Sequence, residues 1–178
     1  GRTITFGIRE RWDVLSWVRY ARERFGENTQ ILLYGVSMGA ATVLMASGLE
    51  LPSNVKGIVA DCPYASPMDI ILHVGKSNPL PQFLIKPFVI LGAWLYGGFD
   101  IRETDAIQSV AKAKIPILII HGEADGFVPA IMSEAIVHAN PTHVTRLTFA
   151  GADHALSYLS DAPRYRKEVR QFVEQALR

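Results

Sequence analysis

Hydrophobic residues recur along this chain with two different periods. Between residues 10 and 25 the apolar positions are spaced as on one face of a helix, at Val14, Val18, Ala21 and Phe25. This spacing predicts an amphipathic helix. Short uninterrupted apolar runs, typical of strands that are buried on both faces, lie at residues 31–34, 55–60 and 115–121. The run 144–149 alternates between apolar and polar residues, which predicts a half-exposed strand near an edge of the sheet.

Helical segments separate these predicted strands. Residues 37–48 are rich in Ala, Met and Leu, Pro129 is a suitable first residue for a helix, and Pro163 opens an amphipathic segment that reaches the C-terminal end. Strands that alternate with helices favour a mostly parallel sheet with helices on both faces. The sequence therefore predicts an α/β fold.

One segment, residues 62–105, interrupts the alternation. Five prolines lie between residues 61 and 115. The segment also has two apolar stretches of helical character, at 68–74 and 83–96. Its length exceeds the 2–6 residues of an ordinary connecting loop, so we expect a helical cap inserted above the sheet of a single domain, 1–178. The apolar run from Phe83 contains Lys86 and Pro87 and is shorter than the ~20 residues that span a bilayer. We therefore expect no membrane span.

Composition narrows the possible partners. The chain has 178 residues, of which 49% are hydrophobic and 20% charged, and its net charge is +1. A net charge this small produces no strong electrostatic field that would attract nucleic acid. The single cysteine, Cys62, excludes an internal disulfide and fits a reducing compartment, so we expect a cytoplasmic protein. No Cys/His spacing indicates a metal site.

A candidate nucleophile lies between the first predicted strand and the helix after it. Residues 35–39 have the pattern G-x-S-x-G, with Ser37 between Gly35 and Gly39. In this context the pattern is typical of a sharp turn that lifts a serine hydroxyl above the sheet. We expect glycine at both positions because a side chain there would collide with the crossing chain. The N–H of Met38, at the start of the helix, would face a developing oxyanion. A glycine-rich turn without chemistry is the alternative.

Serine needs a base, and the base needs an acid to orient it. Asp125 follows the strand 115–121, and His154 follows the strand 144–149. Ligand sites of open α/β sheets lie at these C-terminal strand ends, and the order Ser, acid, His is the one that accompanies this motif. We therefore expect Ser37 as nucleophile, Asp125 as acid and His154 as base.

Other residues compete for these roles. Glu123 is a second acidic residue after the same strand, although we expect it to hold the turn, and Asp61 is an alternative acid at a strand end. We expect His121 to bond the backbone rather than act as base. We also expect Cys62 to be a core residue rather than a nucleophile. The histidines that we expect to be solvated are His73, His138 and His143.

The motif regions 34–41, 115–129 and 151–158 resemble the α/β-hydrolase superfamily. The resemblance is to small bacterial hydrolases of the prolyl-oligopeptidase and dienelactone-hydrolase-like branches. It implies hydrolysis of an ester, thioester or peptide through a covalent acyl-enzyme, without a cofactor. It assigns the catalytic triad to Ser37, Asp125 and His154, and one oxyanion N–H to Met38.

The chain also departs from this family. The family's nucleophile follows the fifth strand of about eight, whereas Ser37 follows the first clear strand. We therefore expect a C-terminal portion of a hydrolase that lacks the second oxyanion donor and is weakly active or inactive alone. Its open sheet edge would be covered by a homo-oligomer or by a missing N-terminal fragment. The expected activity is that of a carboxylesterase for small or medium acyl groups. The alternatives are a peptidase, a thioesterase or a non-catalytic binding module.

Overall fold

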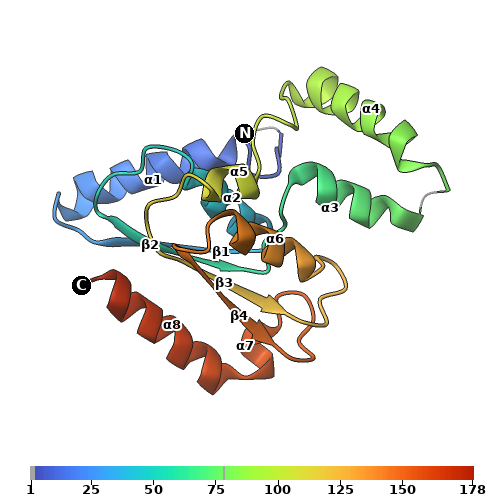
Figure 1. Cartoon of the computed structure of the whole chain (residues 1–178). Helices are drawn as coiled ribbons and strands as arrows, with labels where there is room; N and C mark the ends of the chain where they lie inside the picture. The colour runs from blue at the N-terminus through green and yellow to red at the C-terminus, as the bar shows by residue number, and fades with distance from the viewer. Residues whose placement is uncertain (1–2, 78) are drawn as a thin grey trace.

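A four-stranded parallel sheet forms the centre of the molecule (Figure 1). The computed structural model describes residues 3–77 and 79–178. The strands are β1 (Ile31–Val36), β2 (Val55–Asp61), β3 (Ile117–Gly122) and β4 (Val144–Phe149). Their order in space is β1-β2-β3-β4, and each neighbouring pair is parallel. The predicted α/β class is confirmed, and β4 lies at an edge as its alternating pattern indicated.

Helices cover both faces of this sheet, as Figure 1 shows. One face carries α1 (Glu10–Phe25), α2 (Met38–Ala46), α5 (Ala106–Val110) and α6 (Ile131–Ala139). The other face carries the C-terminal helix α8 (Ala162–Ala176), which is preceded by the short helix α7 (Ser157–Ser160). The Tyr165 hydroxyl of α8 donates a hydrogen bond to Oδ2 of Asp61 at the end of β2, with 2.8 Å between the oxygens.

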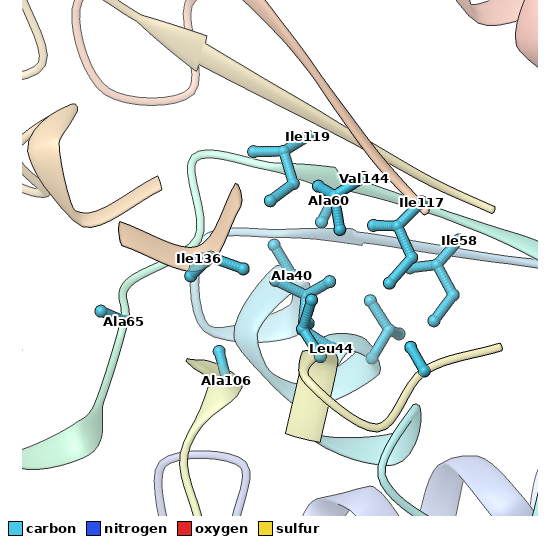
Figure 2. Close-up of a cluster of buried hydrophobic side chains, with 13 residues drawn as sticks. Ala40, Leu44, Ile58, Ala60, Ala65, Ala106, Ile117, Ile119, Ile136 and Val144 are labelled. Atoms are coloured by element: carbon cyan, nitrogen blue, oxygen red, sulfur yellow. The ribbon is translucent and has the colours of Figure 1, made fainter. Parts of the chain in front are cut away.

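The alternation of side chains along each strand divides the core into two layers. On the α2 side, Ile58 of β2 and Ile119 of β3 pack against Ala40 and Leu44, and all four are fully buried (Figure 2). On the α8 side, residues of the intervening positions form a second cluster, made of Val59, Leu118, Ile120, Phe149, Ala152 and Tyr165. Burial on both faces explains why the central strands are continuous apolar runs in the sequence.

Two details of the helices differ from the sequence prediction. In α1 the buried residues are Arg11, Leu15 and Val18, whereas Phe25 is 70% exposed. The guanidinium of Arg11 in this buried stripe pairs with Glu103, with 2.5 Å between Nη2 and Oε1. The helix predicted to open at Pro129 begins at Ile131.

The segment after β2 contains helices and, in its described part, no strand. It comprises α3 (Pro67–Val74), a 3-10 turn η1 (Gly75–Ser77), α4 (Gln82–Gly92) and a π-turn η2 (Ala93–Gly97). A third apolar cluster, which includes Ile70, Phe99 and Met45 of α2, joins this segment to the body of the domain. None of the described helices is both long enough and apolar enough to cross a membrane.

Candidate active site

Ser37 occupies a strained turn between β1 and α2. Its φ of 54° and ψ of −118° lie outside the regions that non-glycine residues favour, a conformation that costs about 1–3 kcal/mol and that is characteristic of functional turns. The turn is fixed because the N–H of Ser37 donates to the carbonyl oxygen of Asp61, with 2.8 Å between N and O. The hydroxyl is thereby held at the C-terminal end of the sheet.

The two glycines of the motif are not equivalent. A Cβ atom added to Gly35 would lie 2.3 Å from the carbonyl oxygen of Gly39, because the first turn of α2 crosses directly over the strand. A Cβ added to Gly39 would meet nothing within 4 Å. The expectation that both positions exclude a side chain is therefore wrong for Gly39. Among the described residues, neighbouring atoms exclude a side chain at position 35 and leave room for one at position 39.

Ser37, His154 and Asp125 form one chain of hydrogen bonds. Nδ1 of His154 lies 2.8 Å from Oδ2 of Asp125, and its Nε2 lies 2.9 Å from Oγ of Ser37. An ionised carboxylate only accepts hydrogen bonds, so Nδ1–H donates to Asp125. Nε2 is then free to accept from the Ser37 hydroxyl. This is the arrangement in which an imidazole can remove a serine proton.

Asp125 is held rigidly beneath this imidazole. Its side chain is fully buried, and Oδ1 accepts the N–H groups of Phe127 at 3.0 Å and Val128 at 2.7 Å. Nε2 of His121 lies 2.9 Å from the carbonyl oxygen of Val128 and 3.3 Å from Oδ2 of Asp125. Burial lowers the pKa of His121, so it is a neutral donor here. His121 thus bonds the backbone as expected, and it also supports Asp125.

The loop that carries His154 is fixed against the loop that carries Asp125. A Cβ on Gly122 would lie 2.2 Å from the carbonyl oxygen of Ala152, so the two loops cross at that glycine. Oδ1 of Asp153 accepts the N–H groups of Gly126 and His154, at 3.0 and 2.7 Å. These two backbone bonds lower the pKa of Asp153. Sequence analysis missed this role, although an Asp directly before the candidate base was a signal.

Glu123, the competitor of Asp125, points elsewhere. Its carboxylate accepts a hydrogen bond from Oγ1 of Thr148 at 2.7 Å and is exposed. Its N–H donates to the carbonyl oxygen of Phe149 at 2.9 Å. Glu123 therefore joins the ends of β3 and β4, which is the structural role expected for it.

Asp61, the other alternative acid, faces α8. Its Oδ2 accepts the Tyr165 hydroxyl at 2.8 Å, and the Tyr165 oxygen lies 2.9 Å from that of Tyr34. Burial raises the pKa of Asp61, an effect that the Tyr165 hydrogen bond partly offsets. The described residues include no hydrogen-bond partner for Oδ1 of Asp61. The two tyrosines were not identified from the sequence, because a tyrosine in an apolar run carries no signal of its partner.

The three histidines expected to be solvated lie apart from this hydrogen-bonded chain. His138 is exposed, with 3.9 Å between its Nε2 and Oε1 of Glu134. His143 is half-buried, and its Nδ1 lies 3.2 Å from Oδ1 of Asn140. His73 is half-buried on α3. The expected exposure to solvent therefore holds for His138, whereas His73 and His143 are only partly exposed.

An apolar pocket of about 480 Å³ opens beside Ser37 and Met38. The residues that complete its wall are Phe6, Tyr64, Ile70, Ile71, Val74, Gly75 and Phe127. Helix α3 supplies three of them, so the segment after β2 borders the nucleophile. Phe127 also stacks at a tilt on the imidazole of His154, with 5.1 Å between the ring centroids. The pocket can hold an apolar group next to the serine hydroxyl.

Met38 also lines this pocket. Met38 is the first residue of α2, so its N–H has no acceptor within the helix, and the positive end of the helix dipole lies there. A negative charge that develops on an atom bound to Ser37 Oγ would be stabilised at this position.

Comparisons with known proteins agree with the fold. The family profile described as alpha/beta hydrolase fold matches residues 9–86. The chain is 26% identical over 175 residues to the uncharacterized protein YqkD of Bacillus subtilis, and the match covers 98% of this chain and 57% of YqkD.

Solved structures of hydrolases share the architecture. The Pyrococcus furiosus esterase Pf2001 superposes with a TM-score of 0.73 at 21% identity, over 98% of this chain and 65% of the esterase. A puromycin-hydrolyzing peptidase of Mycobacterium tuberculosis superposes with a TM-score of 0.65 at 18% identity, over 86% of this chain and 23% of the peptidase. The chain thus spans less than two thirds of the length of these relatives.

Proposed function

We propose that the chain is a serine hydrolase of the α/β-hydrolase superfamily that cleaves carboxylic esters of small or medium acyl groups. The observation that carries the proposal is the hydrogen-bonded chain Ser37–His154–Asp125 at 2.9 and 2.8 Å. Three side chains from three separate loops meet in the order in which nucleophilic catalysis uses them.

The proposed reaction has two halves, acylation and deacylation, and the triad residues act in both. Oγ of Ser37 attacks the ester carbonyl carbon while Nε2 of His154 takes the hydroxyl proton, and Asp125 stabilises the imidazolium that forms. The N–H of Met38 donates to the oxyanion. The tetrahedral intermediate collapses, the alcohol leaves with the proton from His154, and an acyl-enzyme remains. Water then attacks the acyl carbon while His154 takes one of its protons. The second tetrahedral intermediate expels Oγ of Ser37, which takes that proton back from His154, and the carboxylic acid leaves.

The pocket supports the choice of an apolar ester. Its wall contains mainly aliphatic and aromatic side chains, from Phe6, Ile70, Val74 and Phe127 among others. Each methylene buried in such a pocket contributes about 0.8 kcal/mol. None of the described residues that line the wall carries a charge that could bind a charged substrate. We therefore propose aliphatic or aromatic acyl esters, with peptide and thioester hydrolysis as second candidates that use the same nucleophile.

Hydrolysis of a series of p-nitrophenyl esters from acetate to octanoate tests this proposal. We expect release of p-nitrophenol that increases from acetate toward the medium chains and disappears in Ser37→Ala. A serine on the surface of α1, Ser16, provides the matched control, and Ser16→Ala should keep the full rate. Hydrolysis that persists in Ser37→Ala would refute the proposed nucleophile. A folded chain that hydrolyses no ester, peptide or thioester, and whose Ser37 does not react with a fluorophosphonate either, would favour the binding module.

A further inference from the structure

Cys62 lies next to the proposed catalytic residues without taking part in the reaction. It follows β2 directly, and it is fully buried. Its φ of 47° lies in the left-handed region, which is unfavourable for a residue other than glycine. The backbone is held there because the N–H of Cys62 donates to the carbonyl oxygen of Ile120 at 2.8 Å. The chain thus places a thiol at a strained and fixed position at the catalytic end of the sheet.

This thiol is not a competing nucleophile. Burial, followed by the charge of Asp61, raises the pKa of Cys62 to about 12. The thiol is therefore protonated at neutral pH, and the thiolate is the reactive species. The charge of the adjacent Asp61 favours a cation at this point, and its Oδ1 is a buried oxygen without a hydrogen-bond partner among the described residues.

Three different ligand atoms meet at this point. One sulfur of Cys62, one carboxylate oxygen of Asp125 and one ring nitrogen of His154 all lie within 4.8 Å of one another. A tetrahedral Zn²⁺ with bonds of about 2.0–2.3 Å separates its ligand atoms by about 3.3–3.8 Å. The three atoms can therefore reach one cation through small side-chain movements.

The charge of this ligand set also suits a divalent cation. A thiolate and a carboxylate carry two negative charges, and a neutral imidazole adds none, so the complex with a divalent cation is neutral. A neutral complex avoids the cost of a net charge in a buried site. The ligands come from three loops that are far apart in the sequence, which is why no Cys/His spacing predicted a metal site.

We propose that Cys62, Asp125 and His154 bind a thiophilic divalent cation, such as Zn²⁺ or Cd²⁺, and that the bound cation reversibly inhibits the hydrolase. On binding, the thiol releases one proton to water and its sulfur bonds the cation. If Nδ1 of His154 is the ligand, the imidazole proton moves to Nε2. If Nε2 is the ligand, its lone pair is occupied. In both cases Nε2 no longer accepts the proton of Ser37. The inhibition rests on the proposed function, whereas cation binding does not.

A titration with Cd²⁺ tests the binding, with the ultraviolet charge-transfer band between sulfur and cadmium as readout. Because Cys62 is the only cysteine of the chain, this band reports Cys62 alone. We expect saturation at one equivalent in the untagged wild type and equally in Ser37→Ala. His154→Ala and Asp125→Ala should each weaken binding at least tenfold. His143→Ala and Glu123→Gln, as matched controls, should not change it. A band whose midpoint is the same in His154→Ala would overturn the proposal.

Inhibition is measured on the same samples. Ester hydrolysis should fall with the same midpoint as the rise of the band and should recover on addition of EDTA. At a Cd²⁺ concentration that lowers the rate of the wild type tenfold, Cys62→Ser should keep most of its own cation-free rate of ester hydrolysis. Equal inhibition of Cys62→Ser would overturn the proposal. If the cation-free wild type hydrolyses no ester, the proposed function fails, and the titration of Ser37→Ala and His154→Ala still decides on the site.

Discussion

At the scale of single residues, the acid of the proposed triad is distinguished by where its oxygens point. Asp125 and Glu123 follow the same strand two residues apart, yet only Asp125 contacts His154. The N–H groups of Phe127 and Val128 fix the Asp125 carboxylate from below. The difference arises from the loop that residues 126–129 form.

Asp125→Asn should lower kcat for ester hydrolysis by about 10⁴, the loss measured for the equivalent change in a serine protease, because an amide holds the imidazole in the wrong tautomer. Glu123→Gln should retain most of the rate, since the amide oxygen can still accept from Thr148. Steady-state kinetics on the two variants makes the comparison. The opposite order of effects would assign the acid to Glu123.

Gly35→Ala and Gly39→Ala should differ strongly in stability. An alanine Cβ at position 35 would lie 2.3 Å from the carbonyl oxygen of Gly39, so α2 or β1 must shift. Overpacking of this kind costs up to about 3 kcal/mol. The Cβ at position 39 meets nothing within 4 Å. Urea denaturation should show the loss only for Gly35→Ala, and equal midpoints for both variants would contradict the geometry.

At the scale of elements, the start of α1 depends on a single carboxylate. Glu10 accepts hydrogen bonds from the N–H of Thr5 at 2.8 Å, from its hydroxyl at 2.5 Å and from the N–H of Gly7 at 3.0 Å. Partial burial raises the pKa of Glu10, but the hydrogen bonds from Thr5 and Gly7 outweigh it and lower the pKa below the ordinary 4.5. These bonds fix the residues before α1, and Phe6 among them lines the pocket.

Glu10→Gln should therefore destabilise the chain in a pH-dependent way. A carboxyl whose pKa is lower in the folded state stabilises that state above the unfolded pKa, and the stabilisation is lost as the pH falls through the folded pKa. At pH 7 we expect a loss of about 1 kcal/mol for these partly exposed bonds, which disappears as the pH falls from 4.5 through the lowered pKa of the folded state. Thermal unfolding across this range measures it, with exposed Glu50→Gln as control. A constant difference at all pH values would contradict the assignment.

The positions of several helices, strands and turns were predictable from the sequence. The bounds of α1 and β4 coincide with their apolar patterns, and the G-x-S-x-G context located the turn at Ser37. The support from His121, Asp153 and Tyr165 was not predictable, because each contact joins residues of different loops or elements. A one-dimensional pattern gives the period of an element and does not give the partner of a polar side chain.

At the scale of the whole molecule, β1 is the outermost strand of the described sheet. It pairs with β2, and in the described residues no strand pairs with its other side. Tyr34 and Val36 on this strand are 54% and 38% exposed. An edge of this kind presents unpaired N–H and C=O groups and is a template for association.

The isolated chain should therefore self-associate, and the degree of association should increase with protein concentration. Light scattering over a range of protein concentrations should show a mass above that of the 19.7 kDa monomer, and a strand-breaking Val36→Pro should reduce it. A mass of one monomer at every concentration would show that the edge is protected by other means.

The central claim is that Ser37 is an activated nucleophile, and reaction with a fluorophosphonate followed by intact and peptide mass measurement tests it most directly. The probe needs only the serine, its base and one oxyanion donor, so it does not depend on the choice of ester. We predict one adduct per chain, located on Ser37, absent in Ser37→Ala and strongly slowed in His154→Gln. A folded chain that forms no adduct, or forms it on another serine, would contradict the account.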